Sequence, residues 1–311
     1  MSGTGVTGGV DMPAAANQKT GGQRSKPGGK KTALRRSLVW GFAVPSFIGM
    51  AVFYFIPAVA SLFYAFTTTR GGFAGFDNFT DVLTNPAFQL AAKNSAAFIA
   101  VSVPLNMLIP FLLASLLRDL KYRNALAVAF MLPMIIPSGA VVFFWNSVFA
   151  DNGAINSILF RNGMGTVPWL MTDWSFWIIL LVFLFRSIGF NMVLFIAGFT
   201  RIPKDYYEVA RIEGAGVFAT FRYVTFIYLL PTSFIALMMS IINSFRIFRE
   251  IYLLFGPYPH QSVYMLQHFM NNQFLNANMQ RLSVTAIVLS SAVVILVWGA
   301  FSGQRKIADT F

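Results

Sequence analysis

WSFWIILLVFLFRSIGFNMVLFIAGF, residues 174–199, decides the fold class of this chain. The run holds a single charged residue, Arg186, and a single asparagine, Asn191. About 20 predominantly apolar residues suffice to cross the hydrocarbon core of a bilayer as a helix. Lipid offers no partner for unpaired backbone groups, and the run is too long and continuous for a barrel strand. It therefore predicts a transmembrane helix.

Other segments of the chain share this apolar character. Hydrophobic residues make up 56% of the sequence and charged residues only 11%, against about 25% charged in ordinary soluble domains. A soluble protein of this length could not solvate such a surface. The sequence predicts an all-α integral membrane protein with six transmembrane helices. Besides 174–199, the predicted spans are 38–66, 89–117, 124–149, 223–246 and 282–302.

The chain before the first span has a different composition. Residues 1–33 are rich in Gly, Ser, Thr and Lys, and such a segment cannot bury enough apolar surface to fold. We expect a disordered basic cytoplasmic tail there, followed by a permease domain over 34–311. Ala58-Val59-Ala60 is similar to a signal cleavage site. The apolar stretch is too long for a signal peptide, so an uncleaved anchor is predicted.

Basic residues predict the orientation. They gather in the N-terminal tail, in 118–123, in 201–222 and at Arg305 and Lys306. Because cytoplasmic loops carry an excess of Lys and Arg, both termini are predicted to be cytoplasmic. The net charge of +12 then reflects topology, and we expect no nucleic-acid partner. The tail is expected to contact anionic lipid of the inner leaflet.

Several function classes lack the residues they need. The chain has no cysteine and only two histidines, His260 and His268, which argues against disulfides, thiolate sites and a metal centre. We find no nucleophile and base cluster, so no catalytic residue and no enzyme activity are predicted. No Asp or Glu falls well inside a predicted span, which argues against proton coupling. A stand-alone secondary transporter or channel remains the alternative function, and a membrane scaffold or sensor a weaker one.

One loop between predicted spans has a helical pattern of its own. It reads IPKDYYEVARIEGAG over 202–216. Pro203 can open a helix, and Asp205 in the first turn offsets its dipole. Gly214 can end it in a left-handed conformation. Ala210 and Ala215 are small enough for another surface to approach closely. The loop predicts a short cytoplasmic helix at about 204–216.

This loop resembles the EAA loop of binding-protein-dependent ABC importer permeases of the sugar type. Glu208 and Ala210 match the acid and the second alanine, while Val209 and Glu213 depart mildly from the pattern. The wider similarity runs over about 75–302, where Arg249 stands in the place of an acid that often follows the fifth span. Other matching residues are Ile202, Pro203, Tyr207, Gly214, Ala215, Phe221, Gly75 to Phe79, Asn94, Gly189, Phe190, Ala197 to Phe199 and Ser283 to Ala286.

The resemblance implies a type I ABC importer permease in the bacterial inner membrane, forming half of a path for a carbohydrate or similar solute. It implies a cytoplasmic ATPase dimer that binds ATP and Mg²⁺, so no cofactor is expected in this chain. A second permease subunit, usually a different chain, and an extracytoplasmic solute-binding protein are also implied. The residues expected to couple to the ATPase are Tyr207, Glu208, Ala210, Glu213, Gly214 and Ala215.

Polar residues inside spans are candidates for the substrate path, because such residues are costly in lipid. They are Arg186, Asn191, Asn243 and Arg246. They could hydrogen-bond sugar hydroxyls, or, with Arg249, bind an anionic sugar. Alternatively the Asn residues bond between helices, and Arg246 and Arg249 reach the membrane surface. In the predicted outer loop 247–281, the residues that could meet the binding protein or the other permease are His260, Gln261, Tyr264 and Gln267.

Overall fold

The computed structural model describes residues 3, 5, 41 and 43–308. The chain divides into two units, residues 1–57 and 58–311, and each is described by itself. The predicted tail, apart from residues 3 and 5, and the start of the first predicted span at 38–40 lie outside the described residues. The described end of the first unit is helical from Ala43, with a π-helical turn at Ala51–Phe55. α2 (Ile56–Ala65) completes this helix.

The described residues contain helices long and apolar enough to cross a membrane. Besides Ala43–Ala65, they are α4 (Pro86–Leu117), α8 (Trp174–Thr200), the stretch Val217–Phe255 and Met279–Lys306 within α14 (Met279–Ala308). A bent pair of helices supplies a sixth candidate. The Val217–Phe255 stretch joins α10 (Val217–Thr220), a π-helical turn, α11 (Phe226–Arg246) and α12 (Phe248–Phe255).

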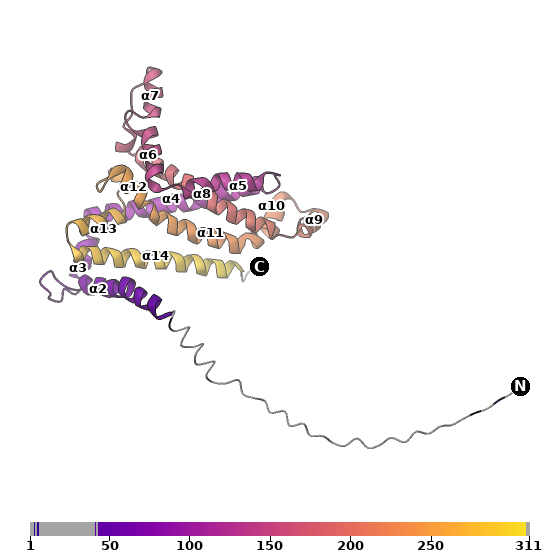
Figure 1. The fold of residues 1–311 in the computed structure, drawn as a ribbon, viewed down its shortest axis with the longest axis horizontal. Coiled ribbons are helices and arrows are strands. Elements are labelled where there is room, and N and C mark those ends of the chain that lie inside the picture. Colours follow the sequence, from indigo (N-terminus) through magenta and orange to yellow (C-terminus); the bar gives the residue numbers. More distant parts are fainter. Residues whose placement is uncertain (1–2, 4, 6–40, 42, 309–311) are drawn as a thin grey trace. The chain divides into compact units, whose positions relative to one another are not determined.

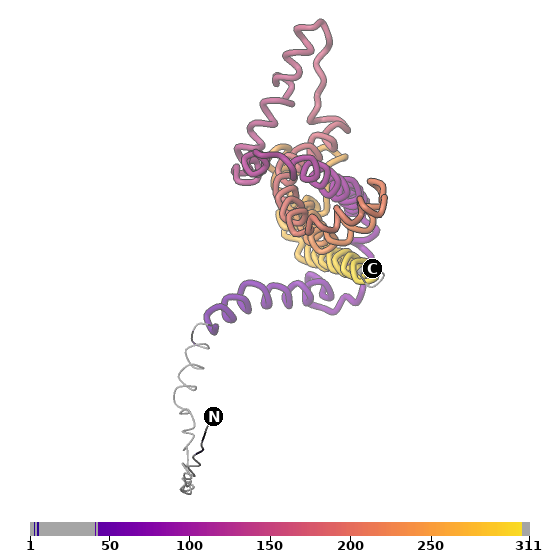
Figure 2. The backbone as a smooth tube through the Cα atoms, turned by 90° about the vertical axis from the view of Figure 1, so that its right-hand side faces the viewer, coloured from indigo at the N-terminus to yellow at the C-terminus, as the bar shows by residue number. Residues whose placement is uncertain are grey.

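The prediction of one continuous helix over 124–149 is wrong. α5 (Arg123–Ile135) and α6 (Ser138–Phe149) are separate helices, and the chain bends by 94° between them. Pro137 disfavours the helical conformation for the residue before it, and Ile136 is extended, with ψ 131°. α6 packs against α12 near its start and then, with α7 (Ala154–Arg161), projects from the bundle in two perpendicular views (Figures 1 and 2).

α8 is the central helix of the second unit. In its most apolar window 61% of residues are buried, against 33% for Val217–Phe255, 28% for α4 and 11% for α14. It packs against α4, α5 and α11. At Gly189 the backbone of α5 comes so close that an added Cβ would lie 1.9 Å from the carbonyl oxygen of Phe130. A helix so enclosed can hold polar groups away from lipid.

The two ends of the bundle differ. α9 (Lys204–Ile212), α10 and the C-terminal end of α14 lie at one end, here called the α9 end (Figure 1). α3 (Asp77–Leu83) and α13 (Leu266–Leu275) lie at the other, here called the α13 end. There Arg281 donates two hydrogen bonds to Asp81, at 2.6 and 2.9 Å, and joins α14 to α3.

The predicted outer loop 247–281 is largely helical and lies at the α13 end. α12 continues the fifth span to Phe255, and Gly256 ends it with φ 77°. A 3₁₀ turn at Gln261–Val263 and α13 follow. The amide of Asn94 on α4 donates to the carbonyls of Gln261 and Tyr264 at 2.6 and 2.9 Å, which attaches the turn to the bundle.

Candidate functional site

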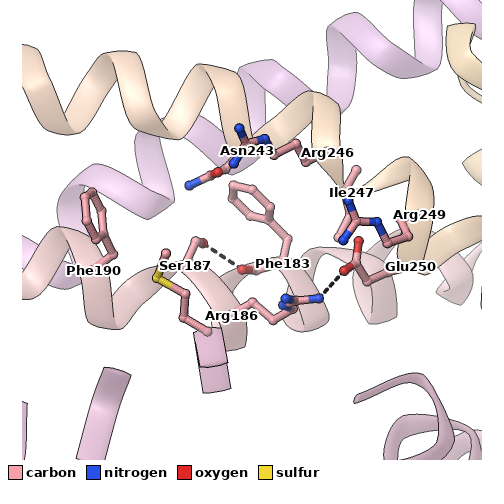
Figure 3. A pocket seen from close by; sticks show the side chains of 10 residues that line it. Phe183, Arg186, Ser187, Phe190, Asn243, Arg246, Ile247, Arg249 and Glu250 are labelled. Atoms are coloured by element: carbon pink, nitrogen blue, oxygen red, sulfur yellow. Dashed lines mark hydrogen bonds and ion pairs between the residues drawn. The ribbon is translucent and has the colours of Figure 1, made fainter. Parts of the chain in front are cut away.

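A cavity of about 500 Å³ opens beside α8, and residues of α5, α8, α11 and α12 line it (Figure 3). Three of the four predicted substrate-path residues, Arg186, Asn243 and Arg246, meet there. The fourth, Asn191, does not line the cavity. The other lining residues are Met134, Phe183, Ser187, Phe190, Ile247, Arg249 and Glu250.

An ion pair forms one wall of this cavity. The guanidinium of Arg186 on α8 donates to the carboxylate of Glu250 on α12, which is only 5% exposed (Figure 3). Ser138, at the start of α6, donates to the same carboxylate oxygen at 2.8 Å and accepts from Arg186 at 2.7 Å. A buried charge needs such partners, because desolvation is costly. The pair therefore compensates both charges and connects three helices.

The cavity lies at half the length of the central span. Arg186 is midway along the 27 residues of α8, so it is about 20 Å from either end of the helix. Glu250 pairs with it, which places the junction of α11 and α12 at the same level. Arg246 and Arg249, on the same cavity, are therefore also far from both ends of α8.

Asn191 belongs to a buried hydrogen-bond network between α4, α8 and α11. Its amide donates to the carbonyl of Asn106 and to the hydroxyl of Ser240, both at 2.8 Å. The amide of Asn106 also donates to Ser240, at 2.9 Å, and its side-chain oxygen accepts from Ser187 at 2.9 Å. This geometry fits the alternative in which the asparagine bonds between helices.

Glu250 and Ser138 are site residues that the sequence did not predict. The predicted fifth span ends at 246, and the resemblance put Arg249 in the place of the family's acid, whereas Glu250 is the buried acid. A signal was present in the sequence: Ile247, Ile251 and Leu254 continue a helical period beyond 246, with Glu250 between them on that face. Ile247 and Ile251 are buried in the core. Ser138 carries no comparable signal, because the bend at Pro137 brings it there.

The short helix predicted between the fourth and fifth spans is α9. It begins after Pro203 and ends at Ile212, four residues earlier than expected. Asp205 lies in its first turn and Arg211 in its last, where each offsets the helix dipole. Gly214 has φ 75°, the left-handed conformation expected of it. The N–H of Ala215 donates to the carbonyl of Ala210 at 2.9 Å and closes the helix end.

The residues predicted to couple to an ATPase divide into an anchoring and an exposed set. Ala210 is buried, and Tyr207 is half-buried, with its hydroxyl 3.2 Å from that of Thr225 and its ring 5.5 Å from the guanidinium of Arg118. Ala215 is also half-buried, whereas Glu208, Glu213 and Gly214 are exposed. Beside the exposed set lie large apolar side chains that are at least 80% exposed, namely Ile212, Val217 and Phe218.

Comparison with known proteins places these features in a family. The family model described as "Binding-protein-dependent transport system inner membrane component" matches residues 106–303, more than half of the chain. The probable ABC transporter permease protein YesP of Bacillus subtilis is 30% identical over 255 residues, which cover 77% of this chain and 82% of that protein. The arabinooligosaccharides transport system permease protein AraP of Bacillus subtilis is 28% identical, covering 68% of this chain and 70% of that protein.

Another relative is the lactose transport system permease protein LacF of Rhizobium radiobacter, which is 28% identical over 68% of this chain and 74% of that protein. Among solved structures, a chain of a bacterial ABC transporter for import of the acidic polysaccharide alginate superposes with a TM-score of 0.77. It is 21% identical, and the match covers 89% of this chain and 98% of that one. The likeness shows that the fold is shared.

Proposed function

Because this chain belongs to the family of inner membrane components of binding-protein-dependent transport systems, we propose that it forms half of the carbohydrate path of an ATP-driven importer. The relatives AraP and LacF are named for transport of arabinooligosaccharides and lactose. A carbohydrate or sugar-like solute is therefore the proposed substrate. The alternative is a stand-alone secondary transporter or channel.

One observation carries this proposal: exposed arginines line a cavity at half the length of the central span. Arg246 and Arg249 are exposed to the cavity of the isolated chain. Charged side chains at this depth are too costly to face lipid, so they face protein or a water-filled path. A second permease subunit, proposed to be a different chain, would cover the open side and complete that path.

We propose that α9 transmits the work of a separate ATPase dimer, which binds ATP and Mg²⁺. Its exposed acids and the neighbouring apolar side chains offer a mixed surface to a cytoplasmic partner. Tyr207 and Ala210 anchor the helix to the bundle. A push on α9 would thus move α8 and α11, and the two halves would rock between inward-open and outward-open states.

The orientation follows from this assignment. With α9 against a cytoplasmic ATPase, the α9 end and both termini face the cytoplasm, and an external binding protein delivers the solute at the α13 end. There His260, Gln261 and Tyr264 lie in and beside the 3₁₀ turn that Asn94 holds. We propose that this turn contributes to contact with the binding protein or with the other permease.

The experiment is a mild-detergent pull-down of the tagged chain from native membranes, followed by mass spectrometry. An ATPase and a second permease should be recovered with the wild-type chain. Gly214→Trp should lose the ATPase, because φ 75° strains any residue other than glycine and the ring adds bulk to the proposed docking surface.

Gly163→Trp is the matched control. Gly163 has φ 73° and equally open surroundings, but it follows α7, far from the α9 end (Figure 1). It should keep the ATPase. Recovery of the wild-type chain alone, at native expression and in several detergents, would contradict the importer and favour the stand-alone transporter.

A further inference from the structure

The charges of the cavity do not balance. Arg186, Arg246, Arg249 and Glu250 line it, and the carboxylate of Glu250 pairs with Arg186. Within the described part of the chain, neither Arg246 nor Arg249 has a hydrogen bond or ion pair with an acid. Figure 3 accordingly draws no interaction from these two guanidiniums to the other lining residues. Two positive charges therefore remain uncompensated in the cavity.

Their depth argues against a purely interfacial role. An arginine near a helix end can extend its guanidinium to the membrane surface. Arg246 and Arg249 instead share the level of Arg186, at the middle of α8, about 20 Å from either end. That distance exceeds the length of an arginine side chain. Among the described residues no acid compensates the two charges, so water, a ligand or the second permease subunit must do so, and the labelling experiment below tests the ligand.

We propose that this cavity binds the anionic group of an acidic sugar through Arg246 and Arg249. This assignment of substrate class rests on the proposed function. A guanidinium offers a planar fork of N–H donors that matches a carboxylate or phosphate. The amide of Asn243 supplies hydrogen bonds for hydroxyls, and the ring of Phe190 supplies an apolar wall. Such a combination of apolar surface and few polar groups suits a small polar ligand.

The ion pair explains why the anion would bind at Arg246 and Arg249. The charge of Arg186 is already neutralised by Glu250, and its guanidinium also donates to the hydroxyl of Ser138, so Arg186 holds the wall in place. Arg246 at the end of α11 and Arg249 at the start of α12 present the uncompensated charges to the cavity. The anionic group of the sugar would lie against these two guanidiniums.

The absence of cysteine from the sequence allows a direct measurement of the cavity's charge. Asn243→Cys places a single thiol of this chain on the cavity wall. In the complex purified from its membrane, we would measure how fast this chain reacts with anionic sulfonatoethyl methanethiosulfonate and with the cationic trimethylammonioethyl reagent. Both rates are normalised to those of a free thiol.

The anionic reagent should react faster, and the ratio of the two rates should fall roughly tenfold in Asn243→Cys with Arg246→Gln and Arg249→Gln, since both nearby charges are removed. Arg161→Gln is the control, because it removes one positive charge from the end of α7, away from the cavity. It should leave the ratio unchanged. Equal rates for both reagents before any arginine is replaced would overturn the proposal.

Protection of the thiol identifies the ligand class. Galacturonate or galactose 1-phosphate should slow labelling of Asn243→Cys, and galactose at the same concentration should protect far less. Protection by galacturonate alone assigns a carboxylate, and protection by the phosphate alone assigns a phosphate. Equal protection by galactose would overturn the anionic assignment and leave the carbohydrate path standing. Loss of ATPase and second permease from the wild-type pull-down would overturn the proposed function separately.

Discussion

Arg186 and Glu250 are 64 residues apart in the sequence, yet their side chains form an ion pair at the middle of the central span. The hydroxyl of Ser138 completes the arrangement. The pair sets the level of α12 against α8 and thereby brings Arg246 and Arg249 to the same cavity. Its removal is therefore a test of both stability and cavity geometry.

Glu250→Gln should destabilise the protein by about 3–5 kcal/mol, because it leaves the half-buried charge of Arg186 without a counter-charge. The double variant Arg186→Met with Glu250→Met should lose less stability than Glu250→Gln, since no unpaired charge remains. The measurement is the free energy of unfolding of the purified permease in mixed detergent micelles.

Arg281→Gln serves as control for that comparison. Its partner Asp81 is half exposed, with a relative side-chain accessibility of 49%, and an exposed pair contributes only about 0–1 kcal/mol. If Arg281→Gln lowered the free energy of unfolding as much as Glu250→Gln does, the burial of the Arg186–Glu250 pair would not be the cause of the loss.

Two asparagines should respond differently to the same substitution. Asn191→Leu breaks the network with Asn106 and Ser240 and should lower stability by about 1–2 kcal/mol. Asn243→Leu changes only a cavity-lining residue and should leave stability within about 0.5 kcal/mol while transport falls. Unfolding curves and solute uptake by reconstituted complexes check both variants. Equal stability losses would contradict the separation of network and cavity.

Gly189→Ala should be severely destabilising, by about 3 kcal/mol or more. The added Cβ would lie 1.9 Å from the carbonyl oxygen of Phe130, and a backbone atom cannot turn aside. Gly139→Ala, in α6, meets no atom within 4 Å and should be tolerated. Unfolding midpoints of the two variants test the close approach of α5 and α8, and similar midpoints would contradict it.

Stability should fall at acidic pH because of His268. Burial lowers the pKa of its imidazole from 6.5 to about 4. Nδ1 accepts from the N–H of Met265 at 3.3 Å, and Nε2 has no hydrogen-bond partner among the described residues. Between pH 6.5 and 4 the imidazole of His268 is protonated in the unfolded chain but neutral in the folded chain. The contribution of the neutral imidazole to the free energy of unfolding is therefore complete above pH 6.5 and is lost as pH falls toward 4.

The test is the unfolding midpoint between pH 7.5 and 4.5. His268→Phe should flatten this part of the curve, whereas His260→Phe should not, because the imidazole of His260 is only half-buried at the edge of the 3₁₀ turn. An unchanged slope in His268→Phe would assign the acid sensitivity to other groups.

Local pattern was enough to predict several elements. The apolar run of α8 needs only its length to be a membrane span, and the helix in 204–216 needs only Pro203 at its start and Gly214 near its end. The continuity of the third span was predicted wrongly. Pro137 stood inside an apolar run, and its effect on Ile136 outweighed the continuity of that run.

The candidate site was predictable in part. Arg186, Asn243 and Arg246 could be selected because charged and amide side chains are costly in lipid, and these residues do meet at one cavity. Asn191 carries the same signal, yet it bonds within the bundle. Residue type alone does not tell whether an asparagine lines the cavity or bonds between helices, because the face that a helix presents to its neighbours depends on how the helices pack.

Composition, apolar length and the loop motif, all properties of contiguous residues, determined that this chain spans a membrane as helices and resembles an importer permease. The pairing of Arg186 with Glu250 and Ser138, and the two arginines left uncompensated beside it, were decided by the packing of α6, α8 and α12. The reason is physical: a helical period fixes which residues share a face, but contact between faces depends on the angles at which helices cross, which no local stretch encodes.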